Sequence, residues 1–319
     1  MKETRDCYII FFVICVFNTQ TFIAQQRSHL LFFKDNLVHF NPAHSGVDGR
    51  KIQLSSRSQW IGIEDAPANN SLSYISKTKK NVTWGYHIET DRVFIENKNS
   101  LAADYAYRLK LDDRKIIHLG VRVGLYSYSF DVNELVRVTN QPNEILSAVR
   151  GYIGNIIGAG IHFADERENA AHFFSLSIPN VVSIRRFKAE NGITTEVSDR
   201  VHSYLIGGSK IKMGDRLLIP HFLIRHVQNA PLLFSFLMGL DFQNKFELGF
   251  GLTNNDYFSG YFSLKKMEKY NLGIGYEFPG NNGKTALRKG TLEFNLIYKL
   301  GGASREVMEV ETISSEAID

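Results

Sequence analysis

The chain has 319 residues, of which 44% are hydrophobic, 22% charged and 12% aromatic, and its formal net charge is +4. Its mean hydropathy is -0.17, and it has no apolar run long enough to span a bilayer, which excludes a protein with several transmembrane helices. The apolar content and the small net charge exclude a disordered chain, and no segment rich in Lys and Arg predicts a nucleic-acid surface. The excess of Phe, Tyr and Gly over Pro favours an all-β fold.

The N-terminus is typical of a secretory signal peptide, which we place at residues 1–24. An apolar stretch at residues 8–17 follows a start that contains Lys2 and Arg5, and this stretch is too short to cross a bilayer. The alternative interpretation is a buried N-terminal strand.

Both cysteines of the chain, Cys7 and Cys15, fall inside this segment. The mature protein would therefore contain no cysteine, which suits an oxidising compartment entered without a disulfide framework. It also removes cysteine nucleophiles and cysteine-ligated metals from consideration. At the other end, residues 301–319 are polar and acidic, and we expect them to form a frayed tail.

Between Lys51 and Leu300 the dominant hydrophobic period is two, the period of β-strands whose two faces differ. In residues 118–125, for example, Leu and Val occupy the odd positions, and His, Gly and Arg the even ones. Most segments have about ten residues, the length that a tilted strand needs to cross a bilayer. We place fourteen of them, at 51–63, 69–77, 81–90, 100–111, 115–130, 155–165, 170–179, 200–212, 215–228, 231–243, 245–254, 256–266, 269–279 and 289–300.

The links between these segments fall into two alternating sets. One set is short, as at 77–80 and 112–114. The long links of the other set lie at 91–99, 131–154, 180–199 and 280–288. Short turns at one rim and long loops at the other are typical of an outer-membrane barrel, whose short turns face the periplasm, whereas a soluble β-sandwich has no reason to sort its links. The sequence therefore predicts a transmembrane outer-membrane β-barrel of about fourteen antiparallel strands.

Several motifs recur along this predicted barrel. NPAHSG at 41–46 precedes the first strand, RSQWIGIEDAP follows at 57–67, and DYAYRL stands at 104–109. SLSIPN at 175–180 and GTLEFNLIYKL at 290–300 come later. In their order and spacing these motifs resemble the PorP/SprF family, outer-membrane proteins of the type IX secretion system and its linked gliding machinery.

The resemblance implies a non-enzymatic outer-membrane protein that binds, helps to export or anchors at the cell surface a cargo protein with a type IX C-terminal sorting domain. It also implies contact with other type IX secretion components and with outer-membrane lipid, without nucleic acid or a cofactor. Three positions depart from the family pattern: His44 and Val47, where small or aromatic residues are usual, and Leu292, where a His is expected. The alternatives are an outer-membrane channel or transporter of hydrophobic substrates, and a structural protein with no dedicated partner.

In this interpretation the barrel occupies residues 51–300, and residues 25–50 form a periplasmic segment or a plug. We expect the long loops at 131–154 and 180–199 to form the rim that faces the cargo, because loops of this length are usually functional or mobile. Apolar residues of the first loop have roughly helical spacing, which predicts a small cap.

The sequence contains no complete enzyme motif. The GKT at 283–285 lacks the glycine that a phosphate-binding loop needs five positions earlier, and no G-x-S-x-G is present. His221 and His226 are five residues apart, on opposite faces of one strand, which argues against a shared metal. We therefore expect no catalytic, cofactor-binding or metal-binding residue, although a Ser–His pair inside a barrel could join residues that are distant in sequence.

The first strand supplies candidate residues for contact with a cargo or a plug. Arg57 should point inwards because a charge on the lipid side is costly, and Gln59 should share its face. The alternative role for Arg57 is an ion pair that only stabilises the barrel. The full set of candidates is Asn41, Pro42, Arg57, Gln59, Trp60, Ala66, Pro67, Asp104, Arg108 and Arg122.

Two further groups in this set have their own alternatives. Asn41 and Pro42 lie either in a docking segment for periplasmic machinery or in a plug. Asp104 and Arg108 should project to the inner face, where they could pair with each other or with Arg122 and Lys110 across the wall. Inner-face glycines such as Gly160 would let neighbouring groups or a plug approach closely.

Overall fold

The computed structural model describes residues 30–130, 151–182, 185–190, 193–198, 200–228, 230–255, 257–266, 269–280 and 289–300. The predicted signal peptide, the predicted cap within residues 131–150, the GKT segment and the C-terminal tail lie outside the described residues. In the described parts of the chain, no helix has the length and apolar character needed to cross a membrane.

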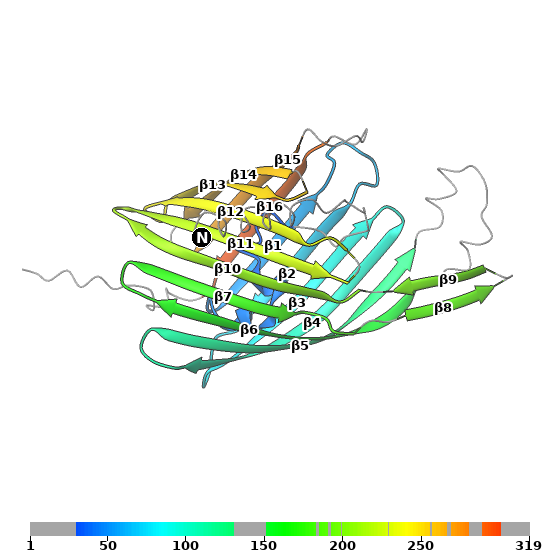
Figure 1. Ribbon diagram of the computed structural model, residues 1–319, viewed down its shortest axis with the longest axis horizontal. Helices are drawn as coiled ribbons and strands as arrows, with labels where there is room; N and C mark the ends of the chain where they lie inside the picture. Colours follow the sequence, from blue (N-terminus) through cyan, green and yellow to red (C-terminus); the bar gives the residue numbers. More distant parts are fainter. Residues whose placement is uncertain are drawn as a thin grey trace, which may run out of the picture.

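Strands make up almost all of the described structure. The strands are β1 (Lys51–Ser58), β2 (Ala68–Ile75), β3 (Val82–Val93), β4 (Glu96–Lys110), β5 (Lys115–Phe130), β6 (Tyr152–Glu166), β7 (Ala170–Ile178), β8 (Arg185–Glu190), β9 (Ile193–Ser198), β10 (His202–Met213), β11 (Arg216–Val227), β12 (Leu233–Phe242), β13 (Phe246–Thr253), β14 (Tyr257–Lys266), β15 (Tyr270–Pro279) and β16 (Thr291–Lys299). Fourteen of them close into one antiparallel barrel, in which β1 pairs with β16 and β7 with β10 (Figure 1). The predicted barrel and its number of strands are confirmed.

The strands β8 and β9 form a separate two-stranded sheet. They continue the β7–β10 hairpin beyond the barrel and project from one end of it (Figure 1). The hairpins β6–β7, β10–β11 and β12–β13 turn at the opposite end. This is the predicted sorting of tight turns to one rim.

One predicted long link is wrong. The segment 91–99 was expected to be a loop, but β3 and β4 continue through it and only Phe94 and Ile95 join them, with Phe94 at a φ of 55°. In this stretch Thr90 Oγ1 donates to Asn99 Oδ1 at 2.9 Å. The pairing residues here are polar, so the apolar alternation that identified the other strands is absent although the backbone pairing continues.

The outer face of the barrel is apolar where a bilayer would surround it. On β5 Leu119, Val121 and Val123 are exposed, whereas His118 and Arg122 are buried on the inner side. This confirms the alternation predicted for these residues. Such an exposed apolar band is unusual in a soluble protein and normal for an outer-membrane barrel.

The short turns are held by local backbone contacts. Between β4 and β5, the Asp112 carboxylate accepts hydrogen bonds from the backbone N–H of Arg114 at 2.8 Å and of Lys115 at 2.7 Å. These two donors favour the charged carboxylate and lower the pKa of Asp112 below its usual value.

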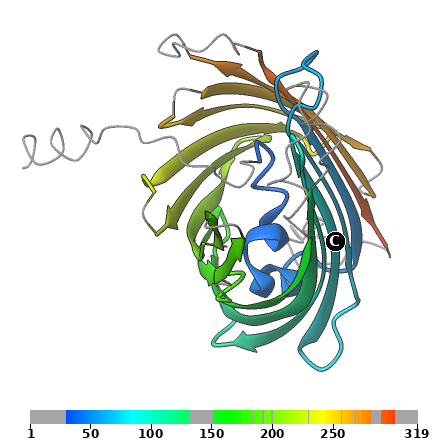
Figure 2. The ribbon, with the colours of Figure 1, turned by 90° about the vertical axis from the view of Figure 1, so that its right-hand side faces the viewer.

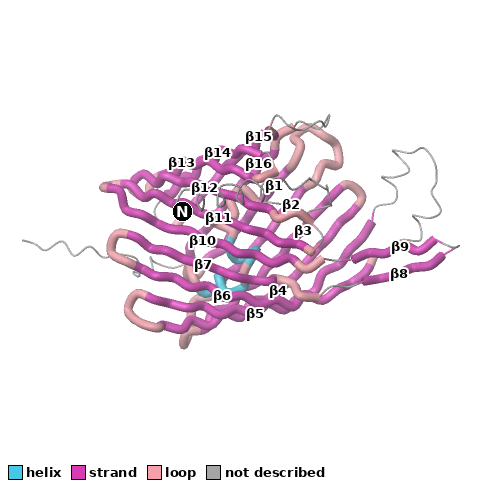
Figure 3. The backbone as a smooth tube through the Cα atoms, viewed as in Figure 1, coloured by secondary structure: helices cyan, strands magenta, loops and turns pink. Residues whose placement is uncertain are grey.

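A segment that precedes the first strand lies inside the barrel. A short helix, α2 (Leu37–Phe40), and a 3-10 turn, η1 (Pro42–Gly46), lie within the ring of strands (Figures 2 and 3). We call residues 30–49 the lumen segment. The buried hydrophobic cluster of the molecule joins this segment to the wall and comprises Leu30, Leu31, Phe32, Phe33, Leu37, Phe40, Tyr204, Ile206, Leu223, Leu237 and Tyr261.

Candidate functional site

The start of the turn η1 is set by the side chain of Asn41, which caps it, and by the proline that follows. Asn41 Oδ1 accepts a hydrogen bond from the Ala43 N–H at 2.9 Å, as an N-cap does. Pro42 stands at the first position of the turn, where its fixed φ suits a helical start. Asn41 Nδ2 donates to the carbonyl of Ile161 at 3.0 Å, so the same side chain ties the turn to β6.

Wall glycines make room for this turn. A Cβ at Gly120 would lie 2.1 Å from the backbone nitrogen of Ala43, and one at Gly160 would lie 2.0 Å from Asn41 Oδ1. Any side chain at these positions would displace the turn, because real Cβ atoms do not approach other atoms so closely. Gly160 therefore has the role expected of an inner-face glycine.

Arg57 lies between two buried carboxylates of neighbouring strands. Its guanidinium is 2.5 Å from Glu277 Oε2 and 3.1 Å from Glu293 Oε2. Glu293 in turn accepts hydrogen bonds from the backbone N–H of Leu31 at 2.7 Å and of Phe32 at 3.0 Å. The inward orientation predicted for Arg57 is present, and this cluster holds the backbone of the lumen segment.

Asp104 and Arg122 form a second cluster on β4 and β5. Arg122 Nε is 2.6 Å from Asp104 Oδ1, and its other nitrogens donate to the carbonyls of Val38 at 2.6 Å and His39 at 3.1 Å. Asp104 also accepts from the hydroxyl of Ser45 at 2.9 Å. The predicted pairing of Asp104 with Arg122 is present, and both charges also bind the lumen segment.

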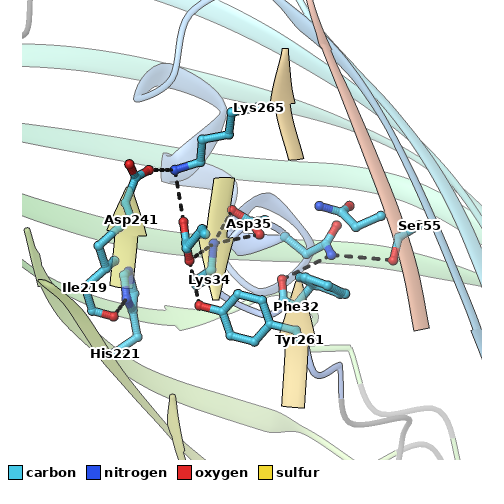
Figure 4. Close-up of polar contacts among 12 residues, drawn as sticks. Phe32, Lys34, Asp35, Ser55, Ile219, His221, Asp241, Tyr261 and Lys265 are labelled. Atoms are coloured by element: carbon cyan, nitrogen blue, oxygen red, sulfur yellow. Dashed lines mark hydrogen bonds and ion pairs between the residues drawn. The ribbon is translucent and has the colours of Figure 1, made fainter. Parts of the chain in front are cut away.

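A third cluster surrounds Lys34 of the lumen segment (Figure 4). Lys34 Nζ lies 2.8 Å from Asp35 Oδ2 and 3.0 Å from Glu247 Oε1. Glu247 also receives a hydrogen bond from Tyr261 at 2.6 Å and pairs with Lys265 at 3.0 Å. Lys265 forms a further ion pair with Asp241. This cluster is not predictable from the sequence, because Asp241, Glu247 and Lys265 look like ordinary inner-face residues of three separate strands.

A group of histidines surrounds His44. His44 Nε2 and His162 Nδ1 both contact Ser175 Oγ, at 2.8 and 2.9 Å, and the two imidazole rings lie 4.3 Å apart. No group of His, Cys, Asp or Glu among the described residues has the geometry to hold a metal ion. His44, one of the departures from the family pattern, thus acts as a packing and hydrogen-bonding residue of the turn.

Three residues of the inner face have the connectivity of a hydrolase triad. His87 contacts Ser73 Oγ through Nδ1 at 2.9 Å and Asp104 Oδ2 through Nε2 at 2.7 Å. Asp104 is shared with Arg122, and Ser73 is only 8% exposed. A hydrolase needs an accessible nucleophile, so a network that fixes the wall explains this trio better.

The remaining candidates lie elsewhere. β1 ends at Ser58, one residue before Gln59, so the expectation that Gln59 shares the inner face with Arg57 stays a prediction. The backbone turns there, with Trp60 at a φ of 49°, and Gln59 N–H donates to the carbonyl of Pro67 at 2.9 Å. Gln59, Trp60, Ala66 and Pro67 therefore lie together in the β1–β2 link at the rim.

The other predicted positions are on the wall or inside it. Arg108 is half-buried near the end of β4, opposite His118 in the register. Asn41 and Pro42 are buried inside the barrel and are thus not available to a periplasmic partner in this conformation. Leu292 is exposed on the outer face, so the residue that replaces the expected His faces lipid.

A comparison with known protein families identifies the chain. The family described as "Type IX secretion system membrane protein PorP/SprF" matches residues 22–298. The chain belongs to the PorP/SprF family. This confirms the resemblance seen in the motifs, and it makes this PorP/SprF protein an outer-membrane protein with a secretion-related role. No curated protein matches it.

Solved structures with a similar fold are outer-membrane barrels. The toluene transporter TbuX from Ralstonia pickettii shares 10% sequence identity, with a TM-score of 0.52, over 82% of this chain and 92% of its own. A TodX deltaS2S3 mutant, a monoaromatic hydrocarbon channel, shares 8% identity, with a TM-score of 0.50, over 81% of this chain and 91% of its own. At such low identity these likenesses concern the fold alone.

Proposed function

We propose that this PorP/SprF protein binds a secreted protein carrying a type IX C-terminal sorting domain, and helps to export it or anchors it at the cell surface. The observation that carries the proposal is the occupied lumen of a barrel from a secretion family. A diffusion pore needs an open, water-filled lumen. Here buried ion pairs and an apolar cluster hold the lumen segment in place, which fits a protein whose task is to engage a partner.

In this proposal the two ends of the barrel contact different partners. The end with β8 and β9 carries the segments that we propose to face the cargo outside the cell, together with the β1–β2 link of Trp60 and Pro67. The end with the tight turns would face the periplasm and other secretion components. In this proposal Arg57, Asp104 and Arg122 act through the lumen segment, and no residue has a catalytic role.

A second candidate function is a channel or transporter for hydrophobic substrates. The observation that favours it is the apolar patch on the inner wall, formed by residues such as Ile206, Leu223 and Leu237. The barrel also shares its fold with TbuX, named as a toluene transporter. In this protein, however, Leu30, Phe32 and Phe33 of the lumen segment pack against that patch.

The decisive experiment is quantitative proteomics of the cell surface and the medium after deletion of the gene. Loss of one or a few proteins with type IX sorting domains from the surface supports the cargo-specific proposal. Their appearance in the medium would assign anchoring, and their retention in the cell would assign export. A uniform fall of all exported proteins would indicate a general part of the translocon, and an unchanged set would rule out the secretion role and favour solute uptake.

A further inference from the structure

The two halves of the lumen segment are held in different ways. Residues 41–46, the anchor half, make specific side-chain contacts, such as those of Asn41 with Ile161 and of His44 with Ser175. Residues 30–40, the apolar half, are held by side chains such as Lys34, which pairs with Glu247, and in addition through several backbone contacts with wall side chains. This difference suggests what the wall around the apolar half is built to bind.

Wall side chains bind the backbone of the apolar half at both ends and in the middle. Glu293 accepts from the N–H groups of Leu31 and Phe32. Arg122 donates to the carbonyls of Val38 and His39. Gln53 Nε2 donates to the Asp35 carbonyl at 2.9 Å and Ser177 Oγ to the Phe40 carbonyl at 2.9 Å. Every polypeptide carries these groups, so such contacts hold a chain without selecting its sequence.

Selection of the bound sequence comes from aromatic side chains on the same wall. The ring of Phe32 lies edge-on to Tyr261 at 5.4 Å between centroids, and the ring of Phe40 lies 5.2 Å from Tyr204. Phe33 packs against His221, with 6.5 Å between ring centroids. Aromatic pairs at such distances contribute beyond their buried area. The wall thus accepts a chain with two adjacent aromatic residues and a third one seven residues later.

The wall charges that hold the apolar half do not depend on it for a partner. Without the apolar half, Glu293 would still pair with Arg57, Arg122 with Asp104, and Glu247 with Lys265. Lys34 would still pair with Asp35, which belongs to the same segment. Withdrawal of the apolar half would therefore leave none of these charges without an oppositely charged neighbour, which avoids the large cost of an unpaired buried charge.

We infer that the lumen contains a polypeptide-binding site, occupied at rest by residues 30–40, and that an aromatic-rich segment of the exported protein exchanges with them. The identity of the partner rests on the proposed function, whereas the site itself rests on the contacts above. The anchor half remains seated against Gly120 and Gly160 during the exchange. The ligand class is an unfolded polypeptide with aromatic side chains, bound by its main chain.

A titration with a peptide of residues 30–41 tests the site on the purified full-length protein. The tethered segment competes at an effective concentration on the order of millimolar, so the labelled peptide is titrated into that range by fluorescence anisotropy. A Phe33→Ala variant weakens the resident segment and leaves the wall unchanged. We expect it to bind the peptide about tenfold more tightly than the unaltered protein, a change equivalent to about 1.4 kcal/mol.

A locked variant provides the matched control. Asn36 Nδ2 lies 3.5 Å from Ser55 Oγ (Ser55 is labelled in Figure 4), so Asn36→Cys with Ser55→Cys can be joined by a short bifunctional thiol reagent. Before reagent the double variant should bind the peptide, and afterwards binding should fall at least about tenfold. A peptide with serine in place of Phe32, Phe33 and Phe40 should not bind either form.

Two results would overturn the inference: equal binding to the locked and unlocked forms, or no binding to the unlocked form and to Phe33→Ala. These results are separate from the fate of the proposed function. A gene deletion that leaves the surface proteins unchanged would remove the cargo as the partner without altering the peptide titration.

Discussion

Arg57 lies between Glu277 and Glu293, and all three side chains are buried in the lumen. We predict that Arg57→Ala destabilises the barrel by about 3–5 kcal/mol, because it leaves two buried carboxylates without a cation. Urea unfolding in lipid vesicles, followed by tryptophan fluorescence, measures this loss. If Arg57→Ala instead assembles normally and retains the cargo normally, Arg57 has no functional role.

The matched control for Arg57 is an ion pair on the surface. Lys110 lies 3.0 Å from Asp113, and both side chains are largely exposed. Lys110→Ala should change the free energy of unfolding by no more than about 0.5 kcal/mol, because water replaces an exposed partner. Equal losses for the two variants would contradict the role of burial at Arg57.

The anchor half packs directly against Gly120. We predict that Gly120→Val weakens the binding of the lumen segment by about 1–3 kcal/mol, because the added side chain overlaps the backbone of Ala43. In a Ser45→Cys background, where the new thiol is buried, maleimide labelling should become about tenfold faster. The chain's own cysteines, at positions 7 and 15, lie far from this site in the sequence.

The control for this experiment is Gly260→Val in the same background. A Cβ at Gly260 would have no neighbour within 4 Å, so the substitution disturbs no packing. The labelling rate should stay unchanged. A similar rate increase in both variants would indicate a general loosening of the barrel.

At the scale of elements, the lumen segment and the barrel are expected to be separable. The strands satisfy their backbone groups by pairing around a closed ring, which stabilises a barrel in lipid without help from its contents. We predict that deletion of residues 30–46 leaves a folded barrel and converts it to an ion-conducting pore. Single-channel recording in planar bilayers measures this, with the full-length protein as the closed reference. A deletion variant that folds without conducting would contradict the prediction.

The ribbon of β8 and β9 pairs with itself and not with the barrel strands. Deletion of residues 184–198 should therefore leave barrel stability within about 0.5 kcal/mol, while it lowers the surface display of the cargo. Heat-dependent gel migration measures the first effect and surface proteomics the second. Replacement by a glycine–serine linker of equal length is the control for loop closure, and normal display in the deletion variant would exclude the ribbon as a cargo contact.

At the scale of the whole molecule, the apolar band defines the orientation of the barrel in the bilayer. The two tryptophans of the chain are suited to test it. Trp84 is 45% exposed on the outer face of β3, close to the tight β2–β3 turn, whereas Trp60 lies in the β1–β2 link. We predict that brominated lipids quench Trp84, measured in Trp60→Phe, more strongly than Trp60, measured in Trp84→Phe. Equal quenching of both would contradict the proposed membrane band.

The sequence allowed much of the barrel to be predicted, because alternation is a local property. A strand with lipid on one side and the lumen on the other must alternate at each step, so the faces of β5 could be read from residues 118–125 alone. The same logic placed Arg57 inwards. It failed where no bilayer imposes a pattern, as in the polar continuation of β3 and β4.

The motifs and the local alternation were thus enough to predict the family, the strand spacing and the direction of most side chains. Which inward residues contact one another is fixed only in the closed barrel. Glu293 binds the backbone of Leu31 across a separation of 262 residues, and Lys34 pairs with Glu247, which also pairs with Lys265 of another strand. Such contacts depend on how the barrel closes and on the course of the lumen segment inside it. Both are set by long-range packing that no local pattern records.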